Sequence, residues 1–250
     1  MAVAARRAPK AVETTPTFGR YADRLRQELE TRRFPSKGER TRFRLKLAAV
    51  QSLERSGFTD LKVSDVCEAA DVALGTFYVY YADKAQIACA VLLDFGDALN
   101  GHAKAVARGS SDYEAILRTN QHFVAAYQLN APLVRSVMQI EDAVPSFRDA
   151  WREQRLHWIE TIAASIARRS GHPETPKELS VQVAYALEGM VFQYLYEVFV
   201  RQDPLLSRFA GSPDQIADLL SVLWYRAIYR EDPPREEVRH ARHLLALRRT

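Results

Sequence analysis

Residues 74–84, LGTFYVYYADK, bring several hydroxyl-bearing side chains and a lysine close together in the sequence. Thr76, Tyr78 and Tyr80 can donate hydrogen bonds to phosphate oxygens, and Lys84 can contact a phosphate as a cation. Aromatic edges and the threonine methyl group can also contact a thymine methyl group in the major groove. The stretch therefore predicts a surface that contacts DNA.

Three helices are needed to position this surface. The spacing of apolar residues predicts helices over 39–56, 64–70 and 74–81, with a turn at 71–73. Phe77 and Tyr81 lie four residues apart, so they share a face that can hold the last helix on the other two. Leu74 and Gly75 then lie on the DNA side, where a glycine lets the backbone approach closely. Two short helices after a supporting one indicate a helix-turn-helix.

Charge is distributed unevenly along the chain. Residues 1–62 hold 15 Lys and Arg against 7 Asp and Glu, whereas residues 63–234 hold 15 against 22. The last sixteen residues, 235–250, hold 5 against 2. A basic beginning on an acidic body favours an anionic partner such as nucleic acid. The alternatives are a basic tail that is only solvated, and a core role for Tyr78 and Tyr80.

Residues 40–84 resemble the TetR family of transcriptional regulators. The resemblance rests on R-x-x-L-x-x-A-A from Arg42 to Ala49, on GF at 57–58, on VSDVCEAADV at 63–72 and on GTFYVYYADK at 75–84. It implies an all-α fold, with a three-helix DNA-binding domain and a C-terminal helical domain that binds a ligand and forms a homodimer. The DNA-binding residues that we expect are Arg40, Arg42, Arg44, Lys62, Ser64, Leu74, Gly75, Thr76, Tyr78, Val79, Tyr80 and Lys84.

The chain departs from the family pattern at several positions. Asp71 stands where the family usually has glycine, and we expect the turn to survive at some cost because Asp tolerates a left-handed backbone. Lys62 stands where Ser or Thr often caps the helix, and Ser64 is a possible substitute. Val79 and Lys46 replace residue types that are usual in the family. Few base-reading donors remain, so DNA shape or the N-terminal arm is expected to contribute to specificity.

About 38 residues precede the helix-turn-helix. We expect residues 1–17 to be disordered and residues 18–33 to form a helix. Its basic side chains can follow a phosphate backbone. Alternatively, Tyr21, Leu25 and Leu29 pack it onto the body, or the segment is a solvated tail.

The remaining sequence reads as helical, with helices at 84–107, 112–128, 131–140, 146–170, 177–201, 213–230 and 235–248. This gives a predicted division into an N-terminal extension (1–37), a DNA-binding domain (38–84), a ligand-binding and dimerisation domain (85–232) and a basic C-terminal helix (233–250). Residues 181–200 and 216–229 are apolar nearly all round, so each must bury two faces. We expect one face to meet a second copy of the chain, through Leu187, Val191, Leu195, Leu220, Leu223 and Trp224.

Large apolar side chains on the inward faces of these helices predict a cavity for a small apolar effector. The residues are Phe95, Phe123, Tyr127, Met138, Trp151, Trp158, Phe192 and Tyr196. The alternative, which the residue types favour for each position taken singly, is plain core. No carboxylate pair has catalytic spacing, and no Cys/His cluster has metal-ligand spacing, so we expect neither a catalytic residue, a metal nor a cofactor.

The sequence shows neither a membrane-spanning run nor a secretory signal, which predicts a cytoplasmic protein without a membrane partner. We therefore expect a homodimeric, ligand-responsive regulator of transcription, most simply a repressor released from double-stranded operator DNA. The alternatives are an all-α carrier or enzyme with a vestigial helix-turn-helix, and an architectural DNA-binding protein without a sensor.

Overall fold

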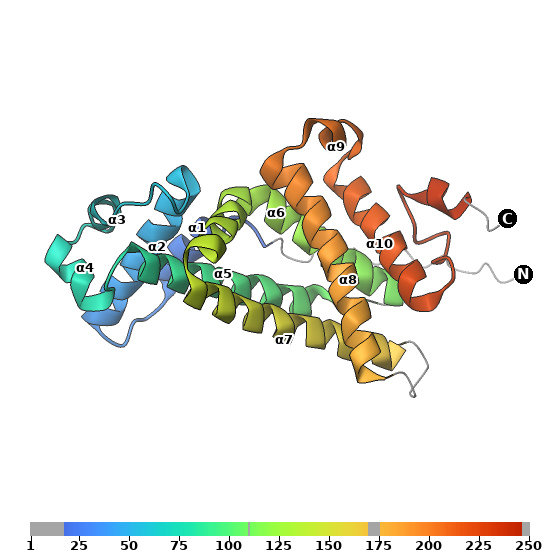
Figure 1. Cartoon of the computed structure of the whole chain (residues 1–250), viewed down its shortest axis with the longest axis horizontal. Helices are drawn as coiled ribbons and strands as arrows, with labels where there is room; N and C mark the ends of the chain where they lie inside the picture. Colours follow the sequence, from blue (N-terminus) through green and yellow to red (C-terminus); the bar gives the residue numbers. More distant parts are fainter. Residues whose placement is uncertain (1–17, 110, 170–175, 247–250) are drawn as a thin grey trace, which may run out of the picture.

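The computed structural model describes residues 18–109, 111–169 and 176–246, and these residues form helices and no strand, which confirms the all-α fold (Figure 1). Residues 1–17, for which the sequence predicts disorder, lie outside the described part. The α-helices are α1 (Tyr21–Thr31), α2 (Lys37–Ser56), α3 (Val63–Ala70), α4 (Leu74–Tyr80), α5 (Lys84–Val106), α6 (Asp112–Ala143), α7 (Pro145–Arg169), α8 (Lys177–Leu195), α9 (Pro204–Phe209) and α10 (Pro213–Tyr229).

Helices α2, α3 and α4 form one end of an elongated molecule, and α5 leads from them into the rest of the helices (Figure 1). Local signals explain where these helices begin and end. The hydroxyl of Ser36 accepts the N–H of Glu39 at the start of α2, and Gly57 ends that helix with a φ of 72°. The carboxylate of Asp83 caps α5 by accepting the N–H of Gln86. The expected three-helix unit is present at the predicted place.

The sequence predicts two helices at 112–128 and 131–140, and α6 consists of two helical stretches that meet at a kink. The kink lies at Asn130, whose φ of −125° and ψ of 25° are not helical. Pro132 follows within the same helix, where it lacks an N–H and its ring crowds the preceding turn. The proline therefore bends the helix without ending it.

The C-terminal part differs from the expectation at three places. The helix predicted for 177–201 is α-helical only to Leu195 and continues as a π-helix, Tyr196–Arg201. The short helix α9 was not expected. The helix predicted for 235–248 is wrong, because the described part holds only a 3₁₀ turn, Arg242–Ala246. There the carboxylate of Asp218 accepts the N–H groups of residues 239–241, which replaces the hydrogen bonds of a helix.

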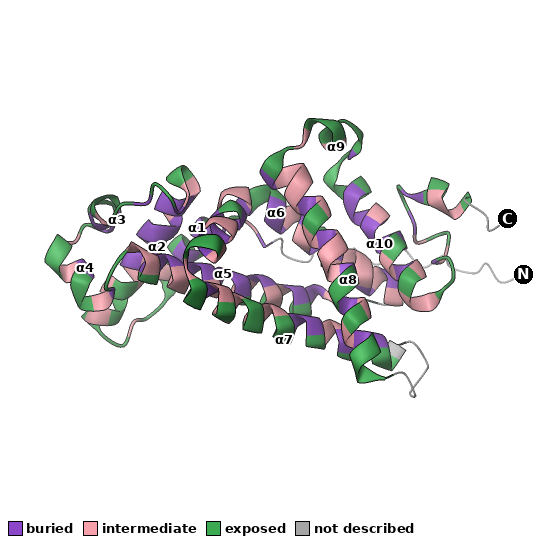
Figure 2. Cartoon of the chain, viewed as in Figure 1, coloured by how far each residue is buried: buried purple, intermediate pink, exposed green. Residues whose placement is uncertain are grey.

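Burial is concentrated along the inward faces of the helices, and the tip formed by α3 and α4 is largely exposed (Figure 2). The main core runs from the helix-turn-helix into the body, from Leu45, Leu53 and Phe77 to Phe95 and Leu133. The N-terminal segment takes part in this core, because Phe18, Tyr21, Ala22 and Leu25 are all buried. Both the DNA-binding end and the body are thus positioned by continuous apolar packing.

Candidate DNA-binding surface and ligand cavity

Helix α4 presents an unpartnered face to solvent. Leu74, Tyr78 and Val79 are 53%, 55% and 77% exposed, while Phe77 between them is fully buried. Phe77 lies against Tyr81 with ring centroids 5.8 Å apart, as expected for the pair that holds the helix in place. A side chain at Gly75 would meet no atom within 4 Å, so packing within the chain does not require a glycine there. The exposed face is suited to contact with a second molecule.

The turn between α3 and α4 is held by a residue that we expected to bind DNA. Asp71 adopts a left-handed backbone, with φ 49° and ψ 58°. Nη2 of Arg44 lies 3.3 Å from the carbonyl oxygen of Asp71 and 3.2 Å from its carboxylate. Arg44 thus stabilises a backbone conformation that an aspartate adopts less readily than a glycine. Its predicted contact with DNA stays a prediction.

The other basic residues of the predicted surface are placed in different ways. Arg40 is exposed on the first turn of α2. The guanidinium of Arg42 lies over the ring of Tyr81, 5.9 Å from its centroid. Lys62 and Ser64 are exposed where α3 begins, and the hydroxyl of Ser64 donates to the carboxylate of its neighbour at a distance of 3.0 Å.

Three further residues of the predicted surface are partly turned towards the protein. Thr76 and Tyr80 are half-buried. The hydroxyl of Tyr80 lies close to Gly38 on α2, where an added Cβ atom would be 3.3 Å from it. The ammonium of Lys84 donates to the carbonyl of Thr59 at 2.9 Å and lies over the ring of Phe58. Lys84 therefore stabilises the loop between α2 and α3, which the sequence did not indicate.

A cavity of about 510 Å³ lies among α5, α6, α7, α8 and α10. Six of the eight residues predicted to bind a ligand line it: Phe123, Tyr127, Met138, Trp151, Trp158 and Phe192. Phe95 and Tyr196 do not line it. Phe95 packs against Phe18 and Tyr21 instead, and Tyr196 stacks on Phe192 with ring centroids 6.0 Å apart.

Sequence reasoning missed the polar and charged residues of the cavity wall. These are Asn100, Lys104, Thr119, Asn120, Glu141, Gln154, Arg155, Thr161, Ser165, Arg168 and Glu188. Arg155 and Glu188 form an ion pair with Nη2 and Oε2 2.6 Å apart. Burial, and then the negative charge of Glu188, raise the pKa of the Tyr127 hydroxyl well above its usual range, so it remains protonated. The wall therefore combines large apolar side chains with polar and charged ones, and two of its charged residues, Arg155 and Glu188, compensate each other.

Four of the residues predicted for a dimer interface lie instead in the core of the chain itself. Leu187, Val191, Leu195 and Leu220 are at most 9% exposed within the single chain, and their predicted contact with a second copy stays a prediction. Trp224 lines the cavity, which also differs from the prediction, and Leu223 alone of the six is exposed. A helix that is apolar all round does not reveal from sequence which face meets its own core.

The outward faces of α8 and α10 carry small or apolar residues. On α8 they include the exposed Ala186 and the half-buried Gly189 and Met190, and on α10 the exposed Leu223 and Ala227. A side chain at Gly189 would meet no atom within 4 Å. These outward faces are open to a partner, and Leu223 is the predicted interface residue that lies on them.

Two histidines that the sequence left without a role form a stacked pair. Nδ1 of His102 and Nδ1 of His122 lie 3.0 Å apart, and Nε2 of His122 lies 3.0 Å from the carbonyl of Leu99. Burial, and then the neighbouring imidazole, lower the pKa of His122 to about 4. Among the described residues there is no group of three or more His, Cys, Asp or Glu that could hold a metal ion. Within the same part of the chain, no helix is long and apolar enough to cross a membrane.

Two family models match the chain, one for each part of the fold. Residues 47–91 match "Bacterial regulatory proteins, tetR family", and residues 116–230 match "Transcriptional regulator EthR, C-terminal domain". No curated protein matches the chain.

Solved structures of similar fold cover most of the chain. One is a TetR-family transcriptional regulator from Mesorhizobium loti, with a TM-score of 0.61 and 16% identity over 76% of this chain and 97% of that one. Another is the fatty acid degradation regulator FadR from Bacillus halodurans, with a TM-score of 0.60 and 14% identity over 78% and 96%. A third, from Marinobacter aquaeolei, has a TM-score of 0.54 and 21% identity over 82% and 98%. At these identities the similarity is one of fold.

Proposed function

Because this chain belongs to the TetR family of transcriptional regulators, we propose that it is a homodimeric repressor released from its operator by a small apolar molecule. It is a ligand-responsive DNA-binding regulator. The observation that supports the proposed mechanism is a large cavity in the same chain as an exposed recognition helix. The two matched ranges also support the predicted division between a DNA-binding domain and an effector domain. We propose that it acts in the cytoplasm, where a bacterial operator is located.

The recognition helix of the proposed complex is α4. Leu74, Tyr78 and Val79 enter the major groove, and the hydroxyl of Tyr78 reaches a phosphate or a base edge. In a dimer, two such helices lie about one turn of DNA apart, roughly 34 Å, or a multiple of that distance. The operator is therefore expected to be an inverted repeat.

The proposed effector is an uncharged, elongated molecule. Along α7 the cavity wall extends from Trp151 to Arg168, which at 1.5 Å per residue corresponds to roughly 25 Å. The middle of the wall is aromatic, and its ion pair, Arg155 with Glu188, is already compensated. A charged group placed there would have to compete with that pair, at a considerable desolvation cost.

Tryptophan fluorescence offers a direct test, because all three tryptophans of the chain line the cavity. A series of uncharged 1-alkanols is titrated into the full-length protein, with and without a DNA fragment that the protein has selected from a random pool. We expect the longer alcohols to change the emission and to release the DNA over the same concentration range. Emission changes without release would contradict the proposed effector response.

A pair of variants provides the control. Ile162→Trp fills the cavity from α7, whereas Leu156→Trp adds the same side chain at an exposed position of the same helix that does not line the cavity. We expect Ile162→Trp to lose the alcohol response and Leu156→Trp to keep it. An equal response in both variants would show that the alcohols act elsewhere.

A further inference from the structure

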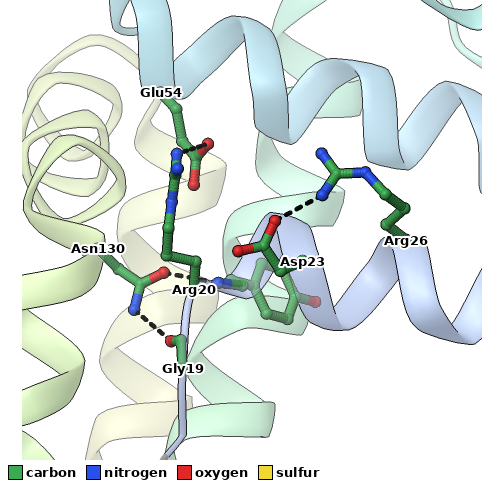
Figure 3. Close-up of polar contacts among 7 residues, drawn as sticks. Gly19, Arg20, Asp23, Arg26, Glu54 and Asn130 are labelled. Carbon is green, nitrogen blue, oxygen red and sulfur yellow. Dashed lines mark hydrogen bonds and ion pairs between the residues drawn. The ribbon is translucent and has the colours of Figure 1, made fainter.

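The N-terminal segment 18–31, here called the strap, joins the two parts of the molecule. It lies outside both ranges matched by the family models. Three consecutive residues contact opposite sides: Gly19 and Tyr21 bind α6, and Arg20 between them binds α2 (Figure 3). The expectation of a helix at 18–33 is confirmed only in part, because α1 begins at Tyr21 and ends at Thr31.

The strap is attached to α6 at the break in that helix. Oδ1 of Asn130 accepts the N–H of Tyr21 at 2.7 Å, and Nδ2 of Asn130 donates to the carbonyl of Gly19 at 3.0 Å. Gly19 has a φ of 71°, a conformation that favours glycine. Asn130 is fully buried, so losing these bonds would leave strap backbone groups without partners. A change in the bend of α6 therefore moves the strap.

The attachment to α2 is an ion pair. Nη2 of Arg20 lies 2.9 Å from Oε2 of Glu54, whose side chain is 10% exposed. Oε1 of Glu54 is buried and has no hydrogen-bond partner among the described residues. Arg20 is thus the main compensation for a largely buried charge near the end of α2, a few residues before the loop to α3. Removing the arginine would strand that charge.

Apolar packing also holds the strap against α5. The rings of Phe18 and Tyr21 lie 6.2 Å and 5.3 Å, centroid to centroid, from the ring of Phe95 on α5. The break in α6 lies between two stretches of cavity wall, with Tyr127 before it and Met138 after it. Whatever changes the cavity therefore acts on the helix that holds the strap.

We propose that the strap couples the bend of α6 at Asn130 to the orientation of α2, and that Asn130, Arg20 and Glu54 are positioning residues for DNA binding. The strap holds the helix-turn-helix in its DNA-binding orientation. This coupling goes beyond the proposed effector response, because it sets the affinity for DNA even when the cavity is empty. Asn130 and Glu54 each bind the strap and not each other. Their effects on the affinity for DNA are therefore transmitted from one to the other by the strap.

The test compares Asn130→Ala, Glu54→Gln and the double variant in the full-length protein. Affinity for the selected DNA fragment is measured by fluorescence anisotropy across a range of salt concentrations. Each single variant is expected to lower the affinity about fivefold or more. The double variant is expected to bind DNA no more weakly than the single variant that has the lower affinity. The salt slope stays unchanged, because no phosphate contact is removed. Additive losses, or unchanged affinity in both single variants, would overturn the proposal.

Two further variants keep the test decisive. Arg26 is exposed and pairs with Asp23 on the same helix, so Arg26→Ala is expected to leave the affinity unchanged. Arg20→Ala alters an exposed side chain. It replaces Asn130→Ala or Glu54→Gln in the test if a melting curve shows that one of these buried-site variants is unfolded. Arg20→Ala should reproduce the loss seen with Glu54→Gln at an unchanged salt slope. A slope lowered by about 0.9 would assign Arg20 to a phosphate and overturn the strap mechanism.

Discussion

Asp71 shows how a single residue can depart from a family pattern without loss of the fold. The left-handed backbone at this position was expected to be tolerated at some cost. Arg44 offsets that cost by bonding to both the carbonyl and the carboxylate of Asp71. Since the aspartate side chain is almost fully solvated, the ion pair itself contributes little, and the bond to the carbonyl is the more useful of the two.

At the same scale, Tyr78 and Lys84 should separate DNA contact from stability. Tyr78 is 55% exposed, so Tyr78→Ala is expected to weaken DNA binding by about tenfold and to leave the melting temperature unchanged. Lys84→Ala removes the bond to Thr59 as well, so it should lower both the affinity and the melting temperature. Anisotropy and thermal melts check both variants. An unchanged affinity in Tyr78→Ala would mean that α4 does not face the groove.

The buried histidine pair predicts a loss of stability in acid. His122 has a pKa lowered to about 4 in the folded protein, against about 6.5 in the unfolded chain. Its contribution is therefore fully present above pH 6.5 and is lost as the pH falls towards 4. The free energy of unfolding should decrease by about 3 kcal/mol across this window. Urea unfolding of the wild type and of His122→Gln at several pH values measures it, and an equally steep decrease in the variant would assign the effect to other groups.

At the scale of whole elements, the outward faces of α8 and α10 are the surfaces that a homodimer would use. Leu223→Glu places a charge on the exposed stripe, where an interface would have to bury it. We expect the variant to be a monomer by light scattering at micromolar concentration, while the wild type is a dimer. Leu156→Glu on α7 is the matched control and should remain a dimer. A wild-type monomer would rule out this assignment.

Some elements could be predicted from the sequence because their signals are local. Ser36, Gly57 and Asp83 mark helix ends within a few residues, and the structure places the helix-turn-helix where those signals indicate. Asn130 and Asp218 could not be interpreted in this way. Their partners lie about 110 and 21–23 residues away, and a side chain that binds distant backbone leaves no pattern in its neighbours.

The candidate site shows the same limit. The aromatic residues of the cavity were predictable from helical spacing, and most of them line it. Arg155 and Glu188 belong to different helices, so their pairing depends on how α7 and α8 cross. Trp224 was assigned to an interface because α10 is apolar on several faces, and only three-dimensional packing shows that its ring meets the cavity.

For the molecule as a whole, the strap, residues 18–31, is expected to be part of the fold. Removing residues 1–31 deletes the buried side chains of Phe18, Tyr21 and Leu25, each worth about 1.5–3 kcal/mol. The melting temperature should fall by about 5 °C or more. The salt slope of DNA binding should not change, because two of the arginines that the deletion removes, Arg20 and Arg26, are paired within the protein. A slope reduced by one or more, at unchanged stability, would instead support the expected DNA contact of the arm.

The way in which the strap is held has a consequence for how regulators of this kind diversify. At Asn130 the strap is recognised through backbone atoms, the carbonyl of Gly19 and the N–H of Tyr21, so a different segment could offer the same groups if it kept a glycine at the position with positive φ. The receiving body needs little more than an amide side chain at one position and a carboxylate at another. A new N-terminal segment could thus be gained by gene fusion and tuned with few substitutions. The helix-turn-helix and the effector domain would keep their sequences, while the segment that connects them evolves.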